Sequence, residues 1–318
     1  MKKRKPKKQF IFLWGNGRKY QDYMCEELKK YKNVFIINNS TNQTWQEKHT
    51  EIIEKYNNEI VGEWRFRRWC IKELNLKKDR INYLIFSEDY FLRIDREVFR
   101  KLCEEFKIKS VLYVNDPIRC RMNLKWDKLT SNKKKVDLII TTDREDARRY
   151  GIVFSPLFYS KVFDNKTNKV EYDICFIGRD KGRGKLINKI KNEAEKNGLI
   201  TKFFLKDADV ESMHDIWVRY EDVLNIVRKS NCLLEVLQEN QSGISLRTME
   251  AVMFNKKLIT NNKDIVNYPF YDKRYIQVFT KIEDLDFNFI KERIEVSYNY
   301  NGECSPIHFL KKVVKLLQ

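Results

Sequence analysis

The stretch from Gln238 to Asn262, QENQSGISLRTMEAVMFNKKLITNN, constrains the fold more than any other part of this 318-residue sequence. It follows an apolar run, Cys232–Leu237, and it contains a second strand-like run, Lys257–Thr260. Between the two runs, a polar loop with a single glycine leads into a helical pattern. A strand, a loop, a helix and a strand in this order form the repeating unit of a parallel α/β sheet.

The helix of this unit begins with residues that suit a phosphate and a sugar. A helix N-terminus presents unpaired N–H groups and the positive end of the helix dipole, so it attracts anions. Gly243 and Ser245 lie in the loop before the helix, and Arg247 lies on its first turn. The Glu250 carboxylate, one turn later, can accept hydrogen bonds from sugar hydroxyls. The alternative is an ordinary cap at Ser245, with Arg247 and Glu250 as a surface i,i+3 pair.

Strand-like and helix-like patterns alternate along the whole chain, which indicates βαβ units. We predict two such series, joined by a polar linker at 158–170 that has no periodicity. The expected strands are Phe10–Trp14, Val34–Ile37, Ile81–Phe86, Val111–Val114 and Val136–Thr141, then Asp173–Ile177, Thr201–Leu205, Cys232–Leu237, Lys257–Thr260 and Tyr275–Phe279. The expected helices include Tyr20–Tyr31, a long region Thr44–Leu76 broken near Gly62, Lys185–Asn197 ended by Gly198, and Tyr220–Lys229.

The fold class that follows is α/β, with two Rossmann-like doubly wound domains facing each other across a cleft. We expect residues 1–158 to form the first domain, residues 170–300 the second, and residues 301–318 a C-terminal helix. Ligands of such sheets bind at the carboxyl ends of the strands. The loops that follow the strands are therefore the candidate sites.

The loop from Gly178 to Gly184 follows a buried strand and precedes a helix. Its glycines allow close approach of a ligand, and Arg179, Lys181 and Arg183 can pair with phosphate oxygens. The loop matches neither a Walker A motif nor a GxGxxG fingerprint. The alternative is a basic exposed turn.

Two carboxylates follow strands of the first series and are candidates for a catalytic base. Asp89 and Asp116 each lie just after a predicted strand, where a carboxylate can take the proton of an acceptor hydroxyl. Helix capping or a turn at Asp116-Pro117 explains the same residues equally well.

Three further motifs carry weaker signals. The loop Gly15–Arg18 follows the first strand and could admit a ligand, although a plain turn is an equal alternative. Asp207–Asp209 has the DxD form of metal-dependent transferases, but we interpret it as a solvated loop and expect no metal. The segment Trp64–Trp69 mixes tryptophans with arginines, which suits base stacking or a membrane surface. The alternative there is arginines extending over buried tryptophans.

The chain is strongly basic, because 63 Lys and Arg against 45 Asp and Glu leave a formal charge of +18. Nucleic acid, an anionic membrane surface and phosphorylated substrates are the partners that such a charge favours. Seven scattered cysteines without a CxxC pair indicate reduced thiols in a cytosolic protein. The apolar run after the basic N-terminus is too short for a secretory signal, so we expect a cytoplasmic protein.

The second half resembles the donor-binding domain of GT-B glycosyltransferases, in particular bacterial enzymes of capsule, exopolysaccharide and lipopolysaccharide assembly. The resemblance covers about residues 110–280. It rests on Tyr172–Gly178 with Arg183, on Gln241, Gly243, Ser245, Arg247 and Glu250, on Lys257–Asn262, and on Asp137–Asp143 with Asp146 and Tyr150-Gly151. At one position the sequence departs from the family, because Gly243 stands where the family carries an acidic residue.

The resemblance implies a nucleotide-sugar donor, for which we expect a UDP-sugar and no further cofactor. Glu250 would take the ribose or sugar hydroxyls, and Gly243 and Ser245 would meet the diphosphate with Gly178. Arg179, Arg183 and Arg247 are then the cations that would neutralise the leaving diphosphate without a metal.

We therefore expect a glycosyltransferase that acts on a glycan or a lipid-linked acceptor in surface polysaccharide synthesis, at the inner face of the membrane. The alternative is a nucleic-acid-binding protein, or a transferase that glycosylates DNA. The sequence names neither the sugar nor the acceptor.

Overall fold

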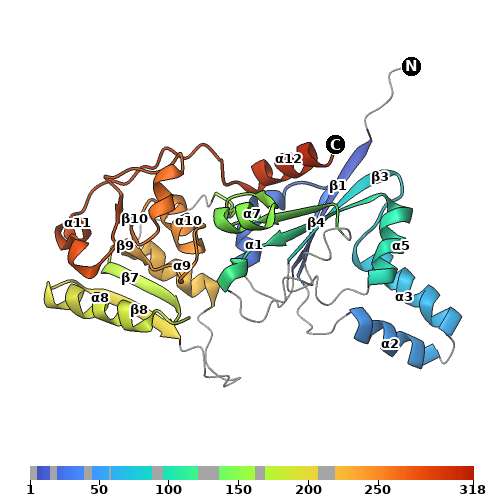
Figure 1. Ribbon diagram of the computed structural model, residues 1–318, viewed down its shortest axis with the longest axis horizontal. Coiled ribbons are helices and arrows are strands. Elements are labelled where there is room, and N and C mark those ends of the chain that lie inside the picture. The colour runs from blue at the N-terminus through green and yellow to red at the C-terminus, as the bar shows by residue number, and fades with distance from the viewer. Residues whose placement is uncertain are drawn as a thin grey trace, which may run out of the picture. The chain divides into compact units, whose positions relative to one another are not determined.

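The computed structural model describes residues 6–14, 20–38, 45–56, 59–87, 96–120, 136–161, 169–206 and 219–318 (Figure 1). The chain divides into two compact units. The first comprises Met1–Thr141, Asp146–Ser155 and Pro306–Gln318, and the second comprises Thr142–Glu145 and Pro156–Ser305. No helix of the described residues is both long and apolar enough to cross a membrane.

The first unit contains a parallel sheet of six strands in the order β2-β1-β3-β4-β5-β6. The strands are β1 (Lys7–Trp14), β2 (Val34–Asn38), β3 (Arg80–Ser87), β4 (Ile108–Val114), β5 (Leu138–Thr141) and β6 (Val153–Phe154). The helices of this unit are α1 (Tyr20–Met24), α2 (Trp45–Tyr56), α3 (Glu59–Glu73), α5 (Arg96–Phe106), α7 (Arg144–Tyr150) and α12 (Pro306–Leu316), with 3-10 turns at η1 (Glu26–Leu28) and η2 (Ile118–Cys120).

Strand β1 shows why its sequence reads as a nearly continuous apolar run. Ile11 and Leu13 point into a core shared with helices α3 and α5. Phe12 points to the opposite face, where its ring lies 6.5 Å from the ring of Phe309 on α12. Successive side chains of a strand point to opposite faces, so a strand covered on both sides must be apolar at nearly every position.

The second unit contains a parallel sheet of five strands in the order β11-β10-β9-β7-β8. The strands are β7 (Tyr172–Arg179), β8 (Thr201–Lys206), β9 (Ser230–Glu235), β10 (Lys257–Thr260) and β11 (Ile276–Val278). The helices are α8 (Gly184–Lys196), α9 (Tyr220–Arg228), α10 (Leu246–Met253) and α11 (Phe287–Lys291), with 3-10 turns at η4 (Lys263–Asn267) and η5 (Ile282–Asp284).

Helices cover both faces of this second sheet. Ile187, Ile190 and Ala194 of α8 share a core with Ile174 of β7 and Leu234 of β9. Helices α9 and α10 pack against β7, β9 and β10, and the alternation of side chains places them on the other face. Two parallel sheets, each between helices, confirm the prediction of two Rossmann-like α/β domains.

Two predicted helices differ from those in the structure. The pattern over Tyr20–Tyr31 is only a five-residue helix α1 followed by the 3-10 turn η1. Gly62 does not break the region Thr44–Leu76: it is buried inside α3, and α2 ends at Tyr56 instead. A glycine that is packed inside a helix costs only about 1 kcal/mol relative to alanine, so it is a weak sign of a helix end.

Candidate functional site

The second sheet has a topological switch point between β7 and β9. From β7 the chain crosses to β8 on one side, and it then returns to β9 on the other side before continuing to β10 and β11. The loops that leave β7 and β9 therefore diverge. A crevice outside the carboxyl ends of strands at such a point is where ligands of open α/β sheets bind. The sequence-predicted loops at Gly178 and Ser242 are these two loops.

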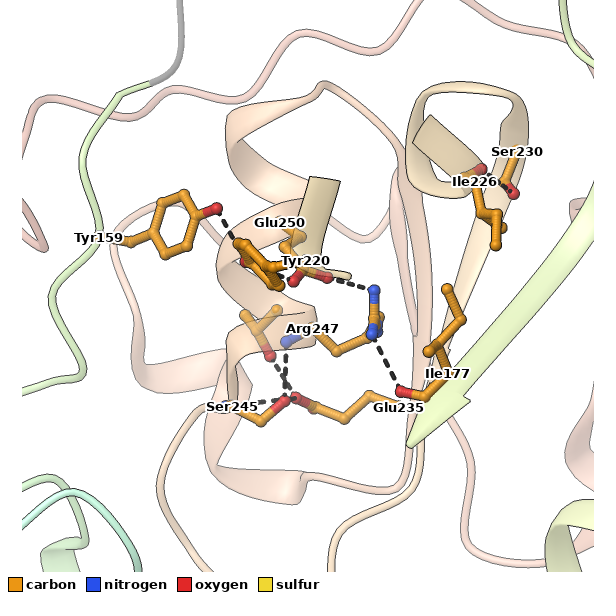
Figure 2. A network of polar contacts seen from close by, with 10 residues as sticks. Tyr159, Ile177, Tyr220, Ile226, Ser230, Glu235, Ser245, Arg247 and Glu250 are labelled. Atoms are coloured by element: carbon orange, nitrogen blue, oxygen red, sulfur yellow. Dashed lines mark hydrogen bonds and ion pairs between the residues drawn. The ribbon is translucent and has the colours of Figure 1, made fainter. Parts of the chain in front are cut away.

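Glu235, the last residue of β9, is the centre of a buried hydrogen-bond network (Figure 2). Its carboxylate accepts bonds from the hydroxyls of Ser245 (2.5 Å), Thr248 (2.7 Å) and Thr260 (2.6 Å), and from the backbone N–H of Ser245 (3.3 Å). The side chain is 2% exposed. One carboxylate thus ties the loop after β9, the first turn of α10 and the end of β10 together.

Ser245 caps helix α10, as the sequence predicts. Its backbone is extended, and its hydroxyl accepts a hydrogen bond from the N–H of Arg247 at 3.0 Å. The same hydroxyl donates to Glu235. Both capacities of the hydroxyl are used, so the position of this helix N-terminus is fixed from two sides.

Arg247 and Glu250 form an ion pair on α10, but the pair is buried and not at the surface (Figure 2). The side chain of Arg247 is 11% exposed and that of Glu250 is 1% exposed. A second nitrogen of the Arg247 guanidinium donates to the carbonyl of Ile177 on β7 at 3.0 Å. Arg247 therefore connects α10 with the strand on the other side of the switch point.

Two tyrosines extend the pair into a chain of polar groups (Figure 2). The hydroxyl of Tyr220, at the start of α9, donates to Glu250 at 2.7 Å and lies 2.9 Å from the hydroxyl of Tyr159. Burial raises the pKa of the Glu250 carboxyl above its usual value, although Arg247 and Tyr220 act in the opposite direction. Burial and the nearby Glu250 also raise the pKa of Tyr220, so this phenol stays protonated and keeps donating.

The loop after β7 is braced by its own side chains. The Asp180 carboxylate accepts from the N–H of Gly184 at 2.6 Å and so caps helix α8. The Arg183 guanidinium donates to the carbonyls of Arg179 (3.1 Å) and Asp180 (3.2 Å), and also to the carbonyl of Val236 beyond β9. Burial lowers the pKa of Arg183. The predicted phosphate cation is thus a link between the two loops, while Arg179 and Lys181 are exposed.

Gly243 lies where no side chain fits. A Cβ atom at this position would stand 2.3 Å from the backbone oxygen of Thr142. The neighbouring Ser242 is held to the same segment, since its N–H and hydroxyl donate to the Asp143 carboxylate at 2.7 and 2.8 Å. Because of this close approach to Thr142, the position requires glycine.

The structure describes only one of the two candidate catalytic bases. Asp116 lies just after β4, partly exposed, ahead of a turn that Asp146 holds through the N–H of Ile118 (2.6 Å) and the Nε of Arg119 (2.7 Å). Asp89 lies outside the described residues.

The loop Gly15–Arg18, the Asp207–Asp209 motif and most of the predicted linker also lie outside the described residues. Within the described part of the chain, no group of three or more His, Cys, Asp or Glu residues could hold a metal ion. The six cysteines there whose side chains are described are free thiols, and five of them are buried, in agreement with the prediction.

The two tryptophans of the arginine-rich segment on α3 have different environments. Trp69 is partly buried against the core, as the alternative of arginines over buried tryptophans requires. Trp64 is 48% exposed, and the guanidinium groups of Arg65 and Arg68 lie 4.9 and 5.3 Å from its ring centre, so the arginines there lie over an exposed ring.

Sequence patterns did not single out Glu235, Tyr220 and Tyr159 as site residues. Glu235 ends an apolar run, and a charged residue at a strand terminus looks like an ordinary strand end. Tyr159 and Tyr220 are each far from Glu250 in sequence, so no spacing rule connects them. A buried strand that closes on a carboxylate, with hydroxyl residues in the next helix, is the signal that could have identified Glu235.

No protein-family model matches the sequence, and no curated protein matches it. Solved structures, in contrast, are similar to this chain. One is an alpha-glucosyltransferase in complex with UDP and a 13-mer DNA containing a central A:G mismatch, with 13% identity and a TM-score of 0.55 over 98% of this chain and 93% of that one. Another is an alpha-glucosyltransferase in complex with UDP-glucose and DNA containing an abasic site, with 12% identity and a TM-score of 0.56 over 98% and 99%.

At such low identity, similarity over the whole length is similarity of fold. The chain has the GT-B fold, which is built from two Rossmann-like domains.

Proposed function

We propose that this protein is a glycosyltransferase that uses a UDP-sugar as donor, and that the donor binds at the switch point of the second unit. The observation that carries the proposal is the pair of loops after β7 and β9, which the Arg183 side chain ties together, beside a helix α10 that Arg247 ties to β7. The two glucosyltransferase structures described above contain UDP or UDP-glucose. In this proposal, the second unit holds the donor and the first unit takes the acceptor.

The diphosphate would lie against the N-terminus of α10 and the loop Gly178–Gly184. Ser245 satisfies the N–H of Arg247, and Glu235 satisfies the N–H of Ser245. The N–H groups of Leu246 and Thr248 would then bind phosphate oxygens. Arg179, at the end of β7, and Lys181 in the loop are both exposed cations and would pair with the phosphate directly. Arg183 and Arg247 would contribute their charge without direct contact to the phosphate, because carbonyls and Glu250 already accept hydrogen bonds from their guanidinium groups.

Glu250 would accept hydrogen bonds from donor hydroxyls. An ionised carboxylate offers about four lone-pair sites, and Tyr220 and Arg247 use two of them. Because Glu250 is 1% exposed, donor binding must widen the access to it. No metal is required in this arrangement, since the helix dipole and Arg179 would offset the charge of the leaving UDP.

We propose DNA as the acceptor. Both similar structures contain DNA, and a charge of +18 favours a polyanion. Internal nucleotides of ordinary DNA carry no free hydroxyl, so the acceptor base must itself be hydroxylated. Asp116 and Asp89 are the carboxylates that would take the proton of this hydroxyl. A glycan or lipid-linked acceptor at the inner face of the membrane, which the sequence resemblance suggests, is the second candidate.

The test is a transfer assay that separates the donor step from the acceptor step. The protein is incubated with radiolabelled UDP-glucose, UDP-galactose or UDP-N-acetylglucosamine, with and without EDTA. The acceptors are plain duplex DNA, duplex DNA with hydroxymethylated pyrimidines, and a polyprenyl-linked sugar. We expect EDTA-insensitive transfer from one UDP-sugar to the hydroxylated DNA.

Variants identify the site that is responsible. Glu250→Ala should abolish transfer, and Glu239→Ala, an exposed carboxylate in the loop after β9, should leave it intact. If the sugar is transferred only to the lipid-linked acceptor, the second candidate and not DNA is the acceptor. Absence of transfer and of UDP binding would overturn the glycosyltransferase proposal.

A further inference from the structure

A groove in the first unit lies between helix α12 and the amino ends of β1 and β2. It has a volume of about 530 Å³, within the range of about 300–1,000 Å³ of sites for small molecules. The residues that line it are Lys8, Phe10, Leu28, Tyr31, Asn33, Val34, Ile307, Leu310, Lys311, Val314, Lys315 and Gln318. Ligands of a parallel sheet bind at the carboxyl ends of its strands, so this groove is separate from the acceptor site proposed for this unit.

One face of α12 forms a wall of the groove. Ile307, Leu310 and Val314 recur at the spacing of a helical face, which is a stripe of apolar side chains. The adjacent face of α12 packs on the sheet, where the ring of Phe309 lies 5.2 Å from that of Tyr113. Leu310 is buried as well, whereas Ile307 and Val314 are only partly buried. The apolar face of the helix therefore extends from the core to the groove.

The rest of the groove is also apolar. Phe10 and Leu28 are buried at its base, and Val34 is partly exposed at the start of the edge strand β2. Tyr31 is 39% exposed. Apolar surface that stays accessible in a concave site marks a place for a hydrocarbon group.

The charged side chains among the described residues that line the groove are all lysines. Lys8, near the start of the described chain, lines it together with Lys311 and Lys315, which are one helical turn apart near its end. No acidic residue is among the described residues that line the groove. Glu26 of the adjacent turn η1 pairs with Lys29, so it does not neutralise these lysines. Two distant parts of the sequence thus bring positive charge to one apolar cavity.

A polyanion such as DNA would use the lysines alone and would gain nothing from the apolar floor. A neutral hydrocarbon would use the floor and leave the lysines without a partner. A ligand with both an apolar body and an anionic group uses all of the lining residues. Such a ligand buries its chain as the hydrophobic effect favours, and its head group can form charge-assisted hydrogen bonds with ammonium groups.

We propose that this groove binds an anionic amphiphile, that is, a hydrocarbon chain that carries a phosphate or carboxylate head group. The chain lies along Leu310 and Val314 between α12 and β2, and the head group lies among Lys8, Lys311 and Lys315. The site does not depend on the proposed transferase activity, because its lining includes none of the residues proposed for the donor or the acceptor site.

The experiment measures binding to the full chain by calorimetry, at amphiphile concentrations below micelle formation. Dodecyl phosphate and dodecanoate are the anionic probes, and dodecyl maltoside is the neutral probe of equal chain length. We expect one anionic molecule per chain, bound at least tenfold more tightly than the maltoside. A tenfold difference corresponds to about 1.4 kcal/mol.

Matched variants test the two halves of the site separately. The double variant Lys311→Glu with Lys315→Glu should weaken binding of the anionic probes at least tenfold. The control, Lys189→Glu with Lys196→Glu on the exposed face of α8, changes the net charge equally and should leave this binding unchanged. Val314→Trp should fill the groove and abolish binding, with Ile307→Trp as a second filling variant if the first does not fold. Val266→Trp, at a position 49% exposed in the second unit, should have no effect.

Two further measurements distinguish a membrane lipid from a soluble amphiphile as the ligand and test whether the lysines bind a simple anion instead. Binding to vesicles that contain phosphatidylglycerol, with the same sensitivity to the variants, would make a membrane lipid the ligand. Binding of the free amphiphiles alone would make it a soluble fatty acid or alkyl phosphate. The proposal is overturned if the filling variants bind normally, or if inorganic phosphate or a DNA duplex competes at the lysines while the filling variants have no effect.

Discussion

The network at the end of β9 and the groove beside α12 are each built around apolar strands and one helix, but they use charge in different ways. In the network, Glu235, Glu250, Arg183 and Arg247 are buried or partly buried, and their polar atoms bond to one another, to hydroxyls and to backbone carbonyls. At the groove, Lys311 and Lys315 are exposed beside apolar side chains.

The difference shows what each region can contribute. Charges that are paired inside a protein hold backbone in place, and they are costly to disturb because a lost partner leaves a buried group unsatisfied. Charges at an exposed rim contribute little to stability and remain available to a ligand. We therefore expect changes in the network to act on the fold and the donor site together, and changes at the groove to act on binding alone.

The largest effect is expected for Glu235→Ala. The substitution leaves the buried hydroxyls of Thr248 and Thr260 and the cap residue Ser245 without their acceptor. At about 1–3 kcal/mol for each unsatisfied group, the free energy of unfolding should fall by about 3 kcal/mol or more. Urea unfolding measures it, with Glu239→Ala as the exposed control. A loss below about 1 kcal/mol would show that Glu235 does not organise the network.

Gly243→Ala should come next. The added Cβ would lie 2.3 Å from the oxygen of Thr142, so the loop must shift, which overpacking data put at about 1–3 kcal/mol. Binding of UDP, measured by calorimetry, should weaken at least tenfold because the shifted loop carries the start of α10.

Gly198→Ala, outside both loops that we place against UDP, is the matched control for this change. Its Cβ would meet no atom within 4 Å, but its φ of +74° disfavours alanine, at about 1 kcal/mol. If the two variants lose UDP affinity equally, a general loss of stability and not the contact with Thr142 accounts for the change.

Tyr220→Phe should have an effect on stability comparable to that of Gly243→Ala. It removes the hydroxyl that donates to Glu250 and meets Tyr159, and a hydrogen bond to a charged group contributes about 1.5–3 kcal/mol. Thermal unfolding with and without UDP measures the loss of stability. The control is Tyr271→Phe, which removes a hydroxyl from a partly exposed tyrosine of the same unit. Equal changes in the two variants would exclude a special role for the tyrosine chain.

The smallest effect on stability is expected at the groove. Lys311→Glu with Lys315→Glu should change the free energy of unfolding by no more than about 0.5 kcal/mol, as is usual for surface substitutions, while it weakens the anionic amphiphiles. A large loss of stability would mean that these lysines hold the helix α12 in place and are not a ligand rim.

The sequence predicted the two sheets because strands buried on both faces leave nearly continuous apolar runs, as in β1 and β9. It also predicted the cap at Ser245 and the helix end at Gly198, whose φ is +74°, since both follow from local backbone chemistry. The order of strands in each sheet was not accessible, because it depends on contacts between residues far apart in the chain.

The charges in the loops were the part that sequence patterns could not interpret. The spacing of Arg247 and Glu250 indicates a helical pair but not whether the pair is buried. Arg183 reads as a free phosphate cation, yet it reaches the carbonyl of Val236, 53 residues away. The contact between Gly243 and Thr142 likewise joins segments about a hundred residues apart, so the need for glycine at this position had no visible cause in the sequence.

The most direct test of the donor site is hydrogen–deuterium exchange of the full chain with and without UDP. The account predicts slower exchange at two segments, the loop 178–184 and the stretch 236–250, because UDP would contact both loops of the switch point and the start of α10. Protection that is absent from both segments, or that appears only in the first unit, would contradict it.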